Sequence, residues 1–250
     1  MEQIKRELFD QHAGQMLGTA WTFLHPLFIM MVYVFVFGVV FKQRIGGTYE
    51  LPLDFTSYII SGLAPWLAIV QSLTKTSGAL TTNSALIKQV VFPIEILPVK
   101  AALSTLLPLL VMLGVYFIYT VGYKQELLWT QLLIPVLVFI YVVWTTGIGM
   151  ILASLSVFVR DVRELVQLFA VAGVFLLPII YLPQWVPSVF KPLLYLNPFS
   201  YLIWCFQDAL YFGRFEHPFA WVVAIFGGVL LFAIGARMFR GLKPYFGDAL

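Results

Sequence analysis

The chain has 250 residues, of which 61% are hydrophobic and only 11% are charged, with a formal net charge of +3. Soluble domains carry about 25% charged residues, so this composition excludes a soluble globular protein and indicates an integral membrane protein. The single cysteine, Cys205, excludes an intrachain disulfide.

Residues 1–20 predict an amphipathic helix that lies in the membrane interface. Ile4 and Leu8 belong to an apolar side with four-residue spacing, whereas Lys5 and Arg6 occupy the other side. The alternative is an ordinary polar N-terminus. We expect no cleavable signal peptide, because no apolar segment of that type precedes residue 21.

Six apolar segments predict six membrane-spanning helices, since about 20 residues cross the hydrocarbon core. Together they make residues 21–250 one transmembrane domain with an all-α fold. The fourth segment exceeds one span, so we expect part of it to tilt, break or extend beyond the bilayer, with Pro135 and the Gly147/Gly149 pair as the weak points. The six segments are residues 21–41, 55–74, 101–123, 127–159, 165–182 and 218–236.

A short amphipathic segment, residues 81–98, separates the second and third spans. Asn83 is a suitable N-cap, and Pro93 and Pro98 interrupt helical backbone further along, so we predict a helix at about residues 83–93. Two interpretations remain open at this point. The segment is either a polar loop between two membrane helices or a helix that docks on a soluble partner at the membrane surface.

Residues 184–214 predict a re-entrant or interfacial helical hairpin before the last span. Asn197 followed by Pro198 is typical of a helix N-cap and first helical residue. The apolar stretch after it is too short to cross a bilayer. Non-helical backbone at such depth must be sheltered by protein or line a wet cavity.

The distribution of basic residues predicts the orientation. Six spans place both termini on one side, and assigning that side to the cytoplasm puts most of the 15 Lys and Arg residues there. The segment 81–98 and the charged residues Arg160, Asp161 and Arg163 then lie on the cytoplasmic side, and the hairpin lies on the opposite side.

The chain lacks the usual signatures of an enzyme. It has no P-loop, no hydrolase motif and no metal-ligand spacing, and His12, His25 and His217 are far apart in sequence. We therefore expect no catalytic residue, no metal and no cofactor on this chain, and no nucleic-acid partner. No ionisable residue lies mid-span, which argues against an ion-coupled carrier; a transporter of this type would take its energy from a partner.

Five ordered motifs resemble the permease subunit of type-2 ABC transporters that export cell-surface polysaccharides, the group of O-antigen, capsule and teichoic acid exporters. The resemblance runs essentially end to end. The motifs are LGTAWTFLHPL at 17–27, LIKQVVFPIEILP at 86–98, VRDVREL at 159–165, PIIY at 178–181 and LNPFSYLI at 196–203.

The resemblance implies a homodimer in the bacterial inner membrane, bound to two copies of a separate ATPase that carries ATP and Mg, and exporting a lipid-linked glycan. The hairpin would form the outer gate. The implied ATPase-coupling residues are Asn83, Leu86, Ile87, Lys88, Val90, Val91, Phe92 and Pro93. The candidates that border the substrate path are the aromatic residues Trp21, Tyr33, Phe35, Phe37 and Tyr181.

Some alternatives stay open. Arg160, Asp161 and Arg163 either form a local ion-pair cap that also anchors the orientation, or help to gate the cytoplasmic entrance or meet the lipid pyrophosphate. Family members often carry more basic residues before the first span and an arginine where this chain has Ile94. O-antigen is the favoured substrate; the alternatives are an exporter of capsule, teichoic acid, drug or lipid, and a stand-alone membrane glycan enzyme or flippase.

Overall fold

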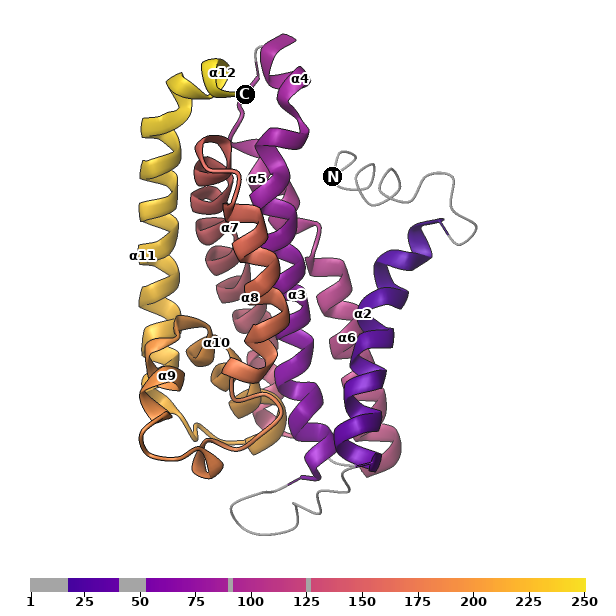
Figure 1. Ribbon diagram of the computed structural model, residues 1–250. Helices are drawn as coiled ribbons and strands as arrows, with labels where there is room; N and C mark the ends of the chain where they lie inside the picture. Colours follow the sequence, from indigo (N-terminus) through magenta and orange to yellow (C-terminus); the bar gives the residue numbers. More distant parts are fainter. Residues whose placement is uncertain (1–17, 41–52, 90–91, 125–126) are drawn as a thin grey trace.

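The computed structural model describes residues 18–40, 53–89, 92–124 and 127–250, and every regular element in these ranges is a helix. This confirms the all-α fold. The long helices lie side by side, with α4 and α12 at one end of the bundle and α9 and α10 at the other (Figure 1). Of the predicted interfacial helix, only the short turn η1 (Gly18–Ala20) belongs to the described residues.

Five helical segments in the described ranges are long and apolar enough to cross a membrane, and they match five of the six predicted spans. The first consists of α2 (Trp21–Tyr33) and η2 (Val34–Val40). The five segments are Trp21–Val40, Phe55–Thr82, Ile96–Gly122, Trp129–Phe158 and Pro218–Tyr245.

The predicted span 165–182 corresponds to α8 (Val162–Leu176), which has only 15 residues. A helix of this length rises about 23 Å, less than the roughly 30 Å of a hydrocarbon core. The helix is interrupted at Pro178, which is the break after α8. The Pro178 carbonyl oxygen accepts hydrogen bonds from the Tyr58 hydroxyl at 3.0 Å and from Gln207 Nε2 at 2.7 Å. Side chains of two other elements thus replace the helical hydrogen bonds of this carbonyl, as a buried non-helical segment requires.

Helix α3 (Phe55–Thr82) is the central helix of the bundle and contacts most of the other long helices. The predicted second span ended at residue 74, but α3 continues for two further turns. The polar side chains in those turns have partners: Lys75 Nζ donates to Ser104 Oγ at 3.1 Å, and Thr76 Oγ1 donates to the Ser72 carbonyl at 2.7 Å. Because these polar side chains are hydrogen-bonded, α3 can continue past residue 74 without leaving them unpaired.

The third span is built from α5 (Ile96–Leu103), α6 (Leu106–Tyr119) and η3 (Thr120–Lys124), and the fourth from η4 (Trp129–Leu133) and α7 (Ile134–Phe158). Of the three predicted outcomes for the fourth segment, a break is not observed, because Trp129–Phe158 is one continuous helical segment of 30 residues; a tilt and an extension beyond the bilayer stay predictions. Pro135 lies in the first turn of α7, where its missing N–H has no helical partner to lose.

Gly147 does not weaken α7 but lets it approach α11 (Pro218–Leu242) closely. A Cβ added at Gly235 of α11 would lie 2.3 Å from the Gly147 carbonyl oxygen. The two backbones are therefore in direct contact, which is a common use of small residues between membrane helices. Gly149 faces another neighbour, Thr76 of α3.

The predicted hairpin consists of η5 (Pro183–Trp185), α9 (Lys191–Leu196), α10 (Pro198–Gln207) and the π-helical η6 (Asp208–Phe212). The Asn197 N-cap is confirmed, because its Oδ1 accepts from the Phe199 N–H at 3.1 Å. Gly213, with φ +66°, ends η6 and turns the chain toward α11. The depth of these helices in a bilayer stays a prediction.

Two buried clusters form the core. The larger one occupies most of the bundle and includes Trp66, Trp144 and Trp204. The smaller one lies toward α4 and joins α3, α5, α7, α11 and α12 (Phe246–Ala249). Its buried residues are Ala79, Leu80, Leu97, Ala101, Met150, Ala153, Val157, Phe239 and Phe246.

Candidate functional site

Helix α4 (Ser84–Gln89) is the observed part of the predicted coupling helix and projects from the end of the bundle (Figure 1). The predicted range was 83–93; Val90 and Val91 lie outside the described residues, and Phe92 and Pro93 are not helical. Pro93 accounts for the non-helical Phe92, because a proline disfavours helical backbone in the residue before it.

Asn83 is the joint between α3 and α4, but its side chain does not form the predicted N-cap. Asn83 Nδ2 donates to the Ala79 carbonyl at 2.8 Å and so caps the end of α3, while its own carbonyl accepts from the Ile87 N–H at 3.1 Å. A single non-helical residue therefore separates the two helices.

The surface of α4 has an anchored side and an open side. Ile87 is half-buried and, together with Phe92 and Ile94, packs against the smaller core cluster. Leu86 is 42% exposed, and Lys88, two residues further along the helix, is also exposed. The open side, defined by these two residues, therefore presents an apolar side chain and a positive charge that flank the anchored Ile87 rather than face each other.

An ion pair holds the segment after α4. Lys243 Nζ lies 2.8 Å and 3.1 Å from the two carboxylate oxygens of Glu95. The hydrogen bond from Lys243 lowers the pKa of Glu95. Because Lys243 belongs to η7 (Lys243–Tyr245), the pair ties the C-terminal region to the base of the coupling segment.

The three candidate gate residues lie at the start of α8, with Arg160 and Asp161 in the turn that follows α7 and Arg163 in the first turn of α8. Arg160 and Asp161 are exposed, whereas Arg163 is half-buried and directs Nη2 toward the Gly78 carbonyl of α3 at 3.5 Å. Within the described part of the chain, no salt bridge joins these three side chains. A local ion-pair cap is therefore not formed, and the gate role stays a prediction.

The candidate path residues do not form one cluster. Trp21 is exposed at the start of α2, whereas the rings of Tyr33 and Phe37 stack at 6.1 Å near the other end of that segment. Phe35 is exposed between them. Tyr181 comes from the break after α8, where its hydroxyl donates to the Phe175 carbonyl at 3.1 Å.

Sequence reasoning missed a polar cluster at the opposite end. Asp208 is only 1% exposed, and its carboxylate accepts from the His217 N–H at 3.0 Å, from His217 Nδ1 at 2.8 Å and from Trp221 Nε1 at 3.0 Å. The available signal was an acidic residue inside an apolar stretch, since a buried carboxylate needs partners.

A family model for ABC-2 type transporters matches residues 3–211. This chain belongs to the ABC-2 type transporter family. The resemblance noted from the five motifs is thereby confirmed for the family. The matched region of this ABC-2 transporter chain includes α4 and all the candidate coupling, path and gate residues.

The ABC-2 transporter chain is also similar over nearly its full length to curated proteins. It is 27% identical over 247 residues to the O-antigen export system permease protein RfbA of Klebsiella pneumoniae, covering 98% of this chain and 92% of the relative. It is 28% identical over 251 residues to the protein of the same name from Myxococcus xanthus, and this match covers 99% of this chain and 93% of the relative. These relatives therefore also cover α11, which the family model does not reach.

Proposed function

We propose that this chain is the membrane permease subunit of an ABC exporter that moves lipid-linked O-antigen across the bacterial inner membrane. The observation that carries the proposal is the nearly full-length similarity to O-antigen export permeases of two organisms. The chain works as a homodimer with two copies of a separate ATP-binding subunit, which holds ATP and Mg and performs the hydrolysis.

Helix α4 is the part of the permease that receives the motion of the ATPase. Leu86 and Lys88 on its open side contact that subunit, and Ile87 anchors the helix to the bundle. Through Asn83 the motion passes to α3. At the other end of α3, the Tyr58 hydroxyl holds the carbonyls of Pro178 and Tyr181 at 3.0 Å and 3.1 Å. One buried helix thus links the ATPase side to the break after α8.

Two apolar faces support the homodimer. On α8, a row of exposed side chains repeats at helical spacing: Leu165, Leu168, Val171 and Phe175. On α2 and η2, the exposed apolar residues include Phe28, Met31 and Phe35. A second copy and the lipid share these faces. The glycan passes between the two copies, and Arg160, Asp161 and Arg163 lie at the entrance of its path. The residues that border the path are Trp21, Tyr33, Phe35, Phe37 and Tyr181.

The charge distribution supports a cytoplasmic position for the α4 end and for both termini. Described basic residues gather toward that end, in the last turns of α3, in α4 and α5, around the start of α8 and at the end of α11 with η7, whereas Lys124, Lys191 and Arg214 lie toward the α9 end. This follows the positive-inside rule. The basic residues toward the α4 end are Lys75, Lys88, Lys100, Arg160, Arg163, Arg237, Arg240 and Lys243.

Deletion of the gene in its own bacterium tests the proposal. O-antigen should disappear from the cell surface while lipid-linked O-antigen accumulates inside, and a plasmid copy should restore export. Unchanged surface O-antigen would refute the proposed substrate. Loss of capsule or teichoic acid instead would assign the chain to one of the alternative exporters.

A further inference from the structure

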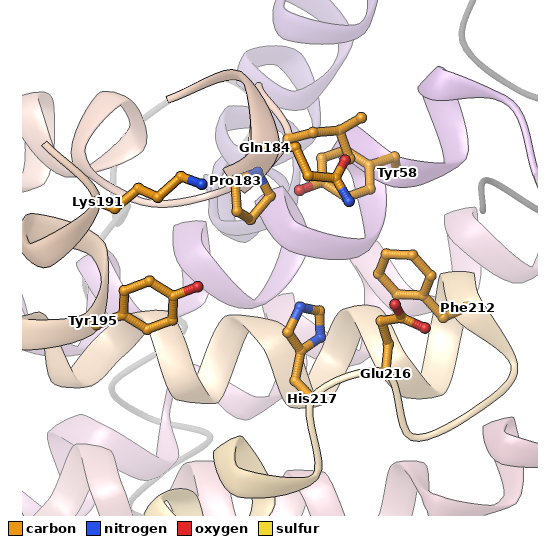
Figure 2. A pocket seen from close by; sticks show the side chains of 9 residues that line it. Tyr58, Pro183, Gln184, Lys191, Tyr195, Phe212, Glu216 and His217 are labelled. Carbon is orange, nitrogen blue, oxygen red and sulfur yellow. The ribbon is translucent and has the colours of Figure 1, made fainter. Parts of the chain in front are cut away.

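A cavity of about 280 Å³ lies at the end of the bundle opposite α4, between the start of α3, η5, α9 and the loop before α11 (Figure 2). Its size is near the lower limit of ligand pockets, which hold about 300–1,000 Å³. A small ring fits such a space better than an extended chain. The residues that line it are Tyr58, Leu182, Pro183, Gln184, Lys191, Tyr195, Phe212, Glu216 and His217.

The imidazole of His217 is held rigidly at the wall of this cavity. It stacks on Trp204 with ring centroids 5.1 Å apart and an interplanar angle of 7°, and its Nδ1 lies 2.8 Å from the buried Asp208 carboxylate. Because an ionised carboxylate only accepts hydrogen bonds, Nδ1 carries the proton. Nε2 is then the ring nitrogen available to a ligand, and in neutral imidazole it is an acceptor.

The other polar groups supply both donors and acceptors. Figure 2 shows Lys191 and Tyr195 of α9 and Glu216 and His217 of the loop before α11 around a common space. Arg214 Nε donates to Glu216 Oε2 at 2.7 Å, which orients that carboxylate. In the described part of the chain, no carboxylate pairs with the Lys191 ammonium.

The mixed character of the wall selects one class of ligand. An anionic phosphate could pair with Lys191 but would use neither acceptor in the wall, Glu216 or His217 Nε2, and an apolar molecule would leave the polar groups without partners. An uncharged sugar ring fits this wall better than either, because each of its hydroxyl groups can both donate and accept a hydrogen bond. Its C–H face can pack on the ring of Tyr195, which is 52% exposed, or on Phe212.

We propose that this cavity binds one uncharged sugar unit of the exported glycan on the exit side of the membrane. The proposal rests on the proposed function. The site is separate from the candidate path residues, and it would hold the emerging chain while the permease resets. His217, positioned by Asp208, is the main hydrogen-bond acceptor, and Lys191 and Gln184 are the donors.

Site-specific photo-crosslinking in cells that produce O-antigen tests this inference. A benzophenone amino acid replaces Trp185 or, as a second position, Phe215, which are exposed and flank the lining residues Gln184 and Glu216 without lining the cavity themselves. An antibody to O-antigen detects the glycan on the purified permease. Val189, which is 80% exposed near α9 but does not line the cavity, is the matched control position. We expect several-fold more glycan on positions 185 and 215 than on position 189.

His217→Ala should reduce that crosslinking about five- to tenfold, the loss of roughly one hydrogen bond, while the permease still assembles with its ATPase. Equal crosslinking at the cavity-flanking and control positions, or no effect of His217→Ala, would overturn the inference. A lipid adduct found by mass spectrometry on the crosslinked permease from cells unable to build the glycan would assign the cavity to the carrier lipid instead. Surface O-antigen measured in the same cells distinguishes failure of this inference from failure of the proposed function.

Discussion

The contact between α7 and α11 gives a prediction whose magnitude can be worked out from the structure. A Cβ added at Gly235 would lie 2.3 Å from the carbonyl oxygen and 3.1 Å from the carbonyl carbon of Gly147. Ordinary van der Waals contact begins at 3.4 Å, and both partners are backbone atoms that cannot rotate away. Gly235→Ala therefore forces the two helices apart.

Overpacking of this kind costs about 1–3 kcal/mol. Replacing glycine by alanine inside a helix also gains up to about 1 kcal/mol from helix propensity, which opposes the clash. Gly114→Ala isolates the second contribution, because Gly114 lies inside α6 and nothing lies within 4 Å of its added Cβ. The difference between the two variants thus measures the clash itself.

The assay is the apparent melting temperature of a detergent-solubilised fluorescent fusion. In a chain of this size 1 kcal/mol corresponds to about 2–4 °C, so Gly235→Ala should melt about 2–12 °C below Gly114→Ala. Equal melting temperatures for the two variants would show that α7 and α11 are not in backbone contact.

Three further predictions use the same assay. Tyr58→Phe removes the donor to the Pro178 and Tyr181 carbonyls and should cost about 1 kcal/mol, whereas Tyr245→Phe, at an exposed tyrosine, should cost nothing measurable. Asp208→Asn replaces the acceptor of three N–H groups and should destabilise the chain by about 1–3 kcal/mol. The control is Asp161→Asn, at an exposed position. Equal melting temperatures for these two variants would contradict the buried cluster. Glu95→Gln should cost less than about 1 kcal/mol at neutral pH, since the Glu95–Lys243 pair is partly exposed. Because the pKa of Glu95 is lowered in the folded state, the stability difference between wild type and Glu95→Gln should be constant above pH 4.5 and disappear as the pH falls further. A stability difference that grows in acid would refute the Glu95–Lys243 ion pair.

Local features of this chain were predictable from its sequence. Asn197 and Pro198 predicted the start of α10, and the uncharged segments predicted five of the helices that are long enough to span. These signals depend on neighbouring residues only. Hydropathy and capping are therefore sufficient to find them.

Other features depend on contacts between distant segments, and the sequence alone predicted them wrongly or not at all. Asn83 caps the helix before it, because α3 extends to Thr82 and its last carbonyls need donors. Gly147 looked like a weak point only because its partner, Gly235, is far away in the chain. His217 looked isolated for the same reason, since the turn at Gly213 brings it back to Asp208.

The central claim is that the open side of α4 receives the ATPase of an O-antigen exporter. The direct measurement is gentle purification of the tagged permease from its own membranes, with quantification of the co-purified ATPase for wild type, Leu86→Asp and Leu193→Asp. Leu193 is an exposed leucine on α9, at the opposite end, and serves as the matched control. The account predicts stoichiometric ATPase with wild type and Leu193→Asp and its loss with Leu86→Asp. Equal ATPase in all three preparations, or none with the wild-type permease, would contradict it.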